Sequence, residues 1–365
     1  MKPARCEGKT AASPARRPGS FRPVVGPLLL LTAIFFLTFM ARIIQAPLMP
    51  AIEEELGISH GAAGSLFFTI SIGYFVSLMG SGFVSARLKH RGVIVLSGFS
   101  VGLALMVIAA SSSLSAVRGS LVALGLAAGL YLPSGIAALT DFVGRQHWGK
   151  AIAIHELAPN LSFVAAPLFA EAVLIWFSWR GVLVLLGAAA ILITLVFAGR
   201  SRAGDFAGEA PNFKSLRALT GEPSFWLMVL LFSLGISSTL GTYTMLPLYL
   251  VAEHGFERDF ANTVVALSRL IGVAMALVGG WVTDRFGPKR TLGIVFLLTG
   301  VFTLLLGLSP TRWVSAVVFL QPMVAVCFFP AGFAALGMVV PPGARNIAVS
   351  FTTPMAFMIG AGLVP

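Results

Sequence analysis

The sequence predicts an all-α protein that crosses a membrane many times. Hydrophobic residues make up 57% of the 365 residues and charged residues only 11%, whereas a soluble domain carries about 25% charged residues. The apolar residues gather in runs of roughly twenty, the length that a helix needs to cross a hydrocarbon core about 30 Å thick. Within lipid every backbone polar group must be paired inside its own span, so we expect these runs to be helices.

Eleven such runs follow one another along the chain. They start near Pro27, Ala62, Val93, Ala116, Gly149, Gly181, Ser224, Ala261, Thr291, Trp313 and Asn346. The last run is still apolar where the sequence stops at Pro365. We therefore expect a twelve-helix plan from which helix 12 is missing.

Charge distribution indicates topology rather than a nucleic-acid partner, despite a net charge of +11. Most of the 25 Lys and Arg residues fall in the N-terminal tail and in alternate loops, as in membrane proteins whose basic loops face the cytoplasm. We expect residues 1–26 to form a disordered cytoplasmic tail. The prediction is a monomer that spans the inner membrane of the cell, with the lipid bilayer and no nucleic acid as a partner.

The chain divides into two halves that repeat one another. A polar linker over 200–223 separates 27–199, which holds six spans, from 224–365, which holds five. Segment 82–91 resembles segment 280–289 at an offset of 198 residues, and the same offset pairs Gly57 with Gly255. One large class of transporters is built from such parallel repeats, with the substrate site between the two halves.

The second copy of the repeat carries a motif between two apolar spans. Its residues are Gly280, Asp284, Arg285, Gly287, Lys289 and Arg290. This segment resembles the signature loop of the major facilitator superfamily. The first copy keeps Gly82, Arg87 and Arg91 but has Ala86 and Lys89 where the motif has Asp and Gly. Two weaker similarities to the family are Gly125-Leu-Ala-Ala-Gly129 and Trp179-Arg180.

The resemblance implies the fold and the general mechanism of the family. It implies two six-helix bundles that move about a central site by alternating access, and both signature loops would form a cytoplasmic gate. It implies a secondary active transporter rather than an enzyme. No ATP-binding loop is present and the two cysteines have no metal-ligand spacing, so we expect no cofactor.

Two arginines lie inside predicted spans, where a charge is costly and therefore indicates function. Arg42 lies in the first span, on one face with Thr38 and Gln45, and Arg269 lies in the eighth. Because they sit at comparable depth in opposite halves, they could grip an anion between them. Each could instead pair with a carboxylate or with helix carbonyls of the protein. Further predicted substrate ligands are Gln45, Tyr131, Thr242 and Gln321.

The fifth predicted span contains the candidate proton site, His155-Glu156. A partly buried carboxylate can take up a proton near neutral pH, so Glu156 is the predicted proton-coupling residue. Alternatively Glu156 neutralises one of the arginines, and His155 is a packed residue.

The sequence thus predicts proton-coupled symport of a small organic anion. Two alternatives stay open: an exporter of drugs or cationic metabolites in which Glu156 binds cation and proton in turn, and a receptor that keeps the fold without transporting.

Overall fold

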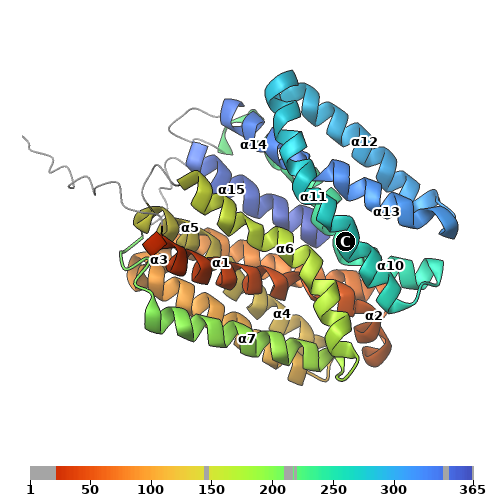
Figure 1. Ribbon diagram of the computed structural model, residues 1–365, viewed down its shortest axis with the longest axis horizontal. Helices are drawn as coiled ribbons and strands as arrows, with labels where there is room; N and C mark the ends of the chain where they lie inside the picture. The colour runs from red at the N-terminus through yellow and green to blue at the C-terminus, as the bar shows by residue number, and fades with distance from the viewer. Residues whose placement is uncertain (1–21, 144–147, 209–216, 218–219, 340–344, 364–365) are drawn as a thin grey trace, which may run out of the picture.

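The protein is a bundle of helices in the computed structural model, which describes residues 22–143, 148–208, 217, 220–339 and 345–363. The first half contains α1 (Arg22–Ile43), α2 (Gln45–Leu56), α3 (His60–Ala110), α4 (Leu114–Gly129), α5 (Tyr131–Phe142), α6 (Trp148–Leu174) and α7 (Trp179–Arg200). The second half contains α9 (Pro223–Ile236), η2 (Ser237–Gly241), α10 (Thr242–His254), α11 (Arg258–Phe286), α12 (Pro288–Leu308), α13 (Thr311–Ala325), α14 (Phe328–Val339), α15 (Arg345–Met358) and η4 (Ile359–Leu363). The predicted all-α fold is confirmed, and in Figure 1 the first half fills the lower part of the view, with α10 to α14 above it.

Nine helical segments within the described ranges are long and apolar enough to cross a membrane. One of them, α3, has 51 residues and leaves helical geometry at Lys89. Since one crossing needs about 20 residues, α3 has the length of two of the predicted spans. The run predicted near Asn346 corresponds to a shorter apolar helix over Phe351–Leu363. The count of eleven crossings stays a prediction.

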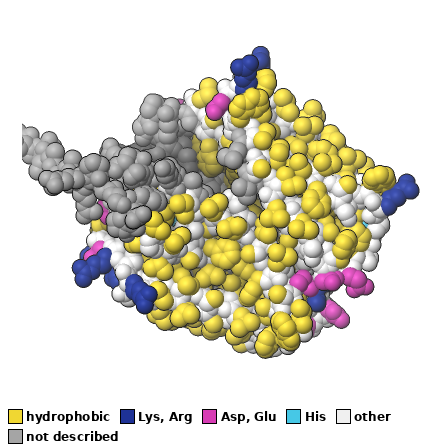
Figure 2. Space-filling view, in the orientation of Figure 1, with side chains coloured by type: hydrophobic (Ala, Val, Ile, Leu, Met, Phe, Trp, Pro, Cys, Tyr) yellow, Lys and Arg dark blue, Asp and Glu magenta, His cyan; other side chains and the backbone are white. Residues whose placement is uncertain are grey.

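Many large apolar side chains are exposed on the surface. Figure 2 shows a broad hydrophobic area with the charged side chains gathered at its margins. Along α12, for example, Leu297, Leu304 and Leu308 are each more than 60% exposed. Exposed leucines in this density are stable in lipid and not in water, so this surface is the one that faces the bilayer.

Three helices are interrupted four residues before a proline. A proline ring clashes with the carbonyl of the residue four positions earlier and donates no hydrogen bond. Accordingly α1 ends at Ile43 before Pro47, α4 ends at Gly129 before Pro133, and α13 gives way to α14 at Val326 before Pro330. A fourth interruption is the π-helix η2 between α9 and α10. All four broken helices contribute residues to the cavity described below.

The internal repeat is visible in the backbone. Gly57 and Gly255, which the offset of 198 residues pairs, both adopt positive φ at the end of a helix, at 60° and 67°. The same offset pairs Lys89 (φ 60°, ψ 160°) with Gly287 (φ 81°, ψ 153°). The first signature segment has therefore lost the glycine but kept the glycine conformation.

This conformation lets the first signature segment bind part of the linker, residues 201–208. The backbone N–H groups of His90 and Arg91 donate to Phe206 and Gly204 at 3.0 and 2.8 Å. The Lys89 ammonium pairs with Asp205 at 2.8 Å and holds the pKa of that exposed carboxyl below its usual value. The Arg91 side chain also donates to the carbonyl oxygens that end α7, at Ala198 and Ser201.

We expect Lys89→Gly to stabilise the protein slightly. A side chain at this φ and ψ costs about 1–3 kcal/mol, which exceeds the entropy that a glycine adds to the unfolded chain. The lost ion pair is exposed and contributes little. The midpoint of thermal unfolding in detergent should therefore rise. Asp205→Asn removes the ion pair alone and should leave the midpoint nearly unchanged, whereas a lower midpoint for Lys89→Gly would contradict this explanation.

Trp179 and Arg180 join three helices at the other end of the first half. The Glu55 carboxylate, near the end of α2, accepts hydrogen bonds from the Trp179 indole at 2.6 Å and from the Arg180 guanidinium at 2.8 and 3.0 Å. Arg180 also donates to the carbonyls of Ala109 and Ser111 at the end of α3, at 2.6 Å each. Positive charge near a helix C-terminus is favourable, so this pair stabilises the half rather than the site.

Candidate functional site

A cavity of about 990 Å³ lies between the two halves. Helices α1, α3, α5 and α6 line it from the first half, and α9, η2, α11, α13, α14 and α15 line it from the second. Nine of its lining side chains are aromatic: Phe35, Phe39, Tyr74, Phe163, Phe232, Phe329, Phe333, Phe351 and Phe357. A cavity of this volume, mostly apolar and with few polar groups, is typical of a small-molecule site.

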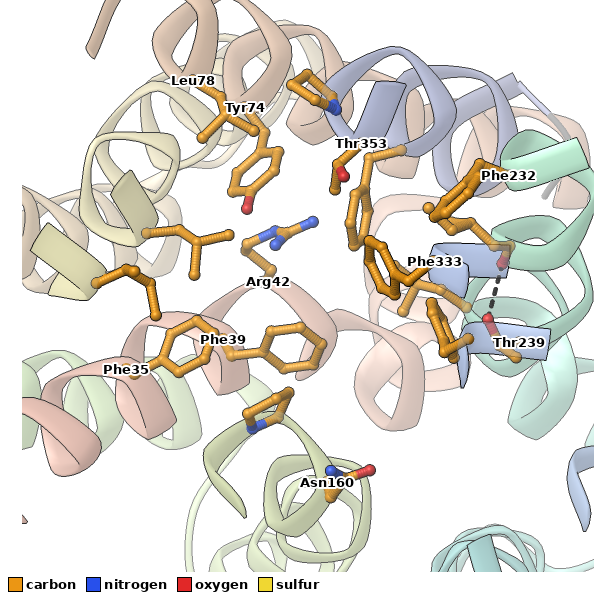
Figure 3. Close-up of a pocket in the computed structure, with 18 of the residues that line it drawn as sticks. Phe35, Phe39, Arg42, Tyr74, Leu78, Asn160, Phe232, Thr239, Phe333 and Thr353 are labelled. Carbon is orange, nitrogen blue, oxygen red and sulfur yellow. Dashed lines mark hydrogen bonds between the residues drawn. The ribbon is translucent and has the colours of Figure 1, made fainter. Parts of the chain in front are cut away.

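Arg42 projects from the end of α1 into this cavity, as Figure 3 shows. Its guanidinium carbon lies 3.7 Å from the centroid of the Tyr74 ring, 5.5 Å from Phe39 and 5.1 Å from Phe357. The residue is only 8% exposed, and its Nε has no hydrogen-bond partner. Among the side chains that the structure describes, no carboxylate forms an ion pair with it.

Arg269 lines the same cavity from α11, in the other half. Its guanidinium lies 5.1 Å from the Phe163 centroid and 4.9 Å from the Tyr243 centroid, and one nitrogen donates to the carbonyl of Thr239 at 3.0 Å. Its Nε is buried without a partner. Within the described side chains Arg269 makes no ion pair either, so aromatic faces and a carbonyl are the groups found around its charge.

Two adjacent rings connect the surroundings of the two arginines. Phe39 lies against Arg42, Phe163 lies against Arg269, and the centroids of the two rings are 5.3 Å apart in an edge-to-face arrangement. Both rings line the cavity. The arrangement therefore offers positive charge at two places with an aromatic surface between them.

The two halves meet at the end of the molecule that carries Gly57 and Gly255. There the Glu171 carboxylate of α6 accepts hydrogen bonds from Arg258 at 3.2 Å and from Asn262 at 2.6 Å, both on α11. The Asn262 amide also donates to the carbonyl of Pro47 in α2 at 3.2 Å. These bonds hold the two halves together at the end of the molecule opposite the signature segments.

At the end with the signature segments, the cavity reaches Gly82, the first residue of the first segment. Arg87 is exposed, and so are four residues of the second segment: Asp284, Arg285, Lys289 and Arg290. Over the described ranges none of these five side chains takes part in an ion pair. Gly280 has open space where a Cβ would lie, and Gly287 makes the turn into α12. Within the part of the chain that the structure describes, no ion pair between the two signature segments closes this end of the cavity.

Four of the six predicted substrate ligands lie outside the cavity lining, namely Gln45, Thr242, Gln321 and Tyr131. Gln45 is buried, and its amide lies 3.4 Å from the carbonyl of Ala41. The Thr242 hydroxyl donates to the carbonyl of Ser237 in the adjoining η2 at 3.4 Å. The Gln321 amide donates to the carbonyl of Ser238 at 2.7 Å and is 1% exposed. In this structure these polar groups bond to backbone carbonyls and join or reinforce helices.

Tyr131 and His155 form a stacked group behind Phe35. The Tyr131 hydroxyl donates to the carbonyl of Leu31 at 2.7 Å and lies 3.1 Å from Nε2 of His155. The Phe35 ring stacks on both, with centroid distances of 5.3 Å to Tyr131 and 4.5 Å to His155. Both side chains are fully buried, and of the three residues only Phe35 lines the cavity.

The backbone of Glu156 lies in α6, four residues before Asn160, which lines the cavity. The Glu156 side chain is outside the described part of the structure.

The aromatic lining was not among the predicted features. In α1 the residues that reach the cavity are Phe35, Phe39 and Arg42, spaced four and three apart, so they share one helical face. The predicted polar face, Thr38 with Arg42 and Gln45, has the same spacing, but Thr38 and Gln45 are buried away from the cavity. A signal was present, because 29 phenylalanines contribute to an aromatic content of 11%.

Comparison with known proteins gives the same fold and a transport context. The chain is 24% identical to the 4-hydroxybenzoate transporter PcaK of Pseudomonas putida over 324 residues, covering 77% of this chain and 71% of that protein. It is 25% identical to the membrane sensor protein UhpC of Salmonella typhimurium, covering 84% and 73%. A bacterial homologue of the human lysosomal transporter Spinster, solved in an inward-facing and unoccupied conformation, superposes with a TM-score of 0.78 at 18% identity, covering 95% and 82%.

The family model of the Major Facilitator Superfamily matches residues 31–365, which is nearly the whole chain. The fold, the two repeated halves with a cavity between them and the predicted signature segment agree with that match. The protein belongs to the major facilitator superfamily.

Proposed function

We propose that this protein carries a small organic anion across the cytoplasmic membrane together with protons, by alternating access. The observation that carries the proposal is the pair of arginines in the cavity, one from each half, with no carboxylate partner among the described side chains. A buried charge is costly unless it is paired. An anionic substrate supplies that partner, and a cationic substrate would be repelled.

The proposed transport cycle follows from the two ends of the cavity. The contacts of Glu171 with Arg258 and Asn262 keep the halves together at one end, while no ion pair among the described residues joins the two signature segments at the other. We assign the latter end to the cytoplasm, so the arrangement corresponds to an inward-facing state. Rotation of the halves would break the Glu171 contacts and bring the signature segments together as the cytoplasmic gate.

Proton coupling is assigned to Glu156. It lies in α6 one helical turn before the cavity residue Asn160, and a carboxylate within a membrane avoids the cost of a buried charge by taking up a proton. A proton carried with the anion would also reduce the charge that each cycle moves across the membrane.

The test is uptake into proteoliposomes that contain the full chain. Labelled benzoate, gluconate and phosphate would be offered with and without an inward proton gradient. We expect uptake of an organic anion that rises several-fold with the gradient and disappears when an ionophore dissipates it. Outward movement of a lipophilic cationic dye, with no anion uptake, would overturn the proposal in favour of an exporter.

A sensor is the second candidate, because the chain is 25% identical to UhpC. A sensor would bind the anion in detergent without exchanging labelled for unlabelled anion across the vesicle membrane. Binding without counterflow would therefore indicate a sensor rather than a transporter, and the arginines would still be the proposed anion site.

A further inference from the structure

We infer that the cavity selects carboxylates that carry an aromatic ring, with the carboxylate bound to Arg42 and the ring packed against Phe39 and Phe163. This inference rests on the proposed transport of an organic anion and names its chemical class.

The first argument is the scarcity of hydrogen-bonding groups in the cavity. Apart from the arginines and Tyr74, the polar side chains of the lining are Ser81, Asn160, Thr239 and Thr353. The hydroxyls of Ser81 and Thr239 already donate to backbone carbonyls about one turn earlier in the chain, at 2.9 and 3.0 Å. A polyhydroxylated anion such as a sugar acid would leave several hydroxyl groups unsatisfied in this cavity, and each unsatisfied group weakens binding.

The second argument concerns the aromatic rings around the Arg42 guanidinium. Three rings surround its guanidinium, and the nearest centroid, that of Tyr74, is 3.7 Å away. These rings take up much of the space around the guanidinium, so we expect a carboxylate to bind it through an edge that the rings leave open. Edge-on binding gives two parallel hydrogen bonds. The part of the substrate beyond its carboxylate would then lie in the space between the rings.

The third argument is the surface next to this edge. Phe39 and Phe163 meet edge to face with centroids 5.3 Å apart, and the Arg269 guanidinium lies 5.1 Å from the Phe163 centroid. A flat ring gains both stacking and apolar contact on such a surface, whereas an aliphatic chain gains only the apolar contact. Arg269 would then face the far side of the ring, where it can bind a polar substituent.

The experiment compares carboxylates of similar size in the same proteoliposomes. Benzoate, 4-hydroxybenzoate, cyclohexanecarboxylate and gluconate would compete with the labelled anion that is transported best. We expect the two aromatic acids to inhibit at concentrations about tenfold lower than cyclohexanecarboxylate, and gluconate to be weaker still. Equal inhibition by gluconate or cyclohexanecarboxylate would overturn the aromatic assignment while leaving anion transport intact.

Substitution of Phe163 tests whether the selectivity arises at the proposed surface. Phe163→Leu keeps the apolar volume but removes the ring, so it should bring the preference for benzoate over cyclohexanecarboxylate close to one. The matched control is Phe333→Leu, a ring of the lining that contacts Phe232 rather than either arginine and should leave the preference unchanged. An unchanged preference in Phe163→Leu would move the ring site elsewhere, and absence of any anion uptake in the unmodified protein would reject the transport proposal itself.

Discussion

Replacement of Arg42 by alanine should lower anion uptake at least about 100-fold. The guanidinium edge offers two charge-assisted hydrogen bonds, each worth roughly 1.5–3 kcal/mol in a buried site. A loss of about 3 kcal/mol or more corresponds to two decades in affinity. The measurement is the initial rate of uptake of a labelled anion into proteoliposomes, at a concentration below the half-saturating value for the unmodified protein.

Two comparison variants separate the role of Arg42 from a general loss of structure. Arg42→Lys keeps the charge but loses the planar pair of donors, so uptake should fall by about tenfold rather than 100-fold. Arg118→Ala removes a partly buried arginine that donates to Ser65 at 3.0 Å and lies outside the cavity lining, so it should transport normally. Uptake within twofold of normal in Arg42→Ala would contradict the anion site.

The sequence predicted the helical fold because the physics of lipid leaves few choices. Long apolar runs must be helices in a bilayer, and the offset between the halves fixed where the repeats begin. The same reasoning identified Arg42 and Arg269, because charges within spans are rare enough to be informative. The structure places both in one cavity, although their role as substrate ligands stays a prediction.

The same reasoning does not tell which uncharged polar side chains face the cavity. In a helix that is apolar on all sides, helical periodicity does not distinguish the cavity face from the faces that touch lipid or neighbouring helices. Tyr131 and Gln321 were therefore expected at the substrate site, yet both are buried and bonded to carbonyls of other helices. The phenylalanines of the lining were missed for the same reason.

Lys89 illustrates a different limit. As a sequence the first signature segment is degraded, since the motif glycine is replaced by lysine. The backbone nevertheless takes the same positive φ as Gly287, and the segment binds residues of the linker through Asp205, Gly204 and Phe206. A pattern of residue types cannot reveal that a neighbouring segment stabilises a strained conformation.

The close packing of α3 on α4 predicts the largest effect on folding. A Cβ at Gly125 would lie 2.1 Å from the carbonyl oxygen of Ile70, and one at Gly73 would lie 2.2 Å from the carbonyl oxygen of Val122. These are backbone atoms, which cannot rotate away as a side chain can. The two helices can accept Gly125→Ala only by moving apart along the whole of their contact.

We therefore expect Gly125→Ala to destabilise the protein by about 3 kcal/mol or more, at or above the upper end of the usual cost of overpacking a core. The midpoint of thermal unfolding in detergent should fall, and much of the protein should elute as aggregate in gel filtration. Gly119→Ala in the same helix is the matched control, because nothing lies within 4 Å of a Cβ there and alanine favours helix. Equal midpoints for the two variants would show that α3 and α4 can separate freely.

Even a small movement of α3 away from α4 would also change the geometry of the proposed anion site. Tyr74, whose ring lies over the Arg42 guanidinium, follows Gly73 directly in α3, and its backbone nitrogen would be only 2.8 Å from a Cβ at Gly125. Any protein of the Gly125→Ala variant that does fold should thus bind anion more weakly, because the ring that holds the guanidinium has moved with the helix. The same interface that stabilises the first half thereby fixes the geometry of the proposed anion site.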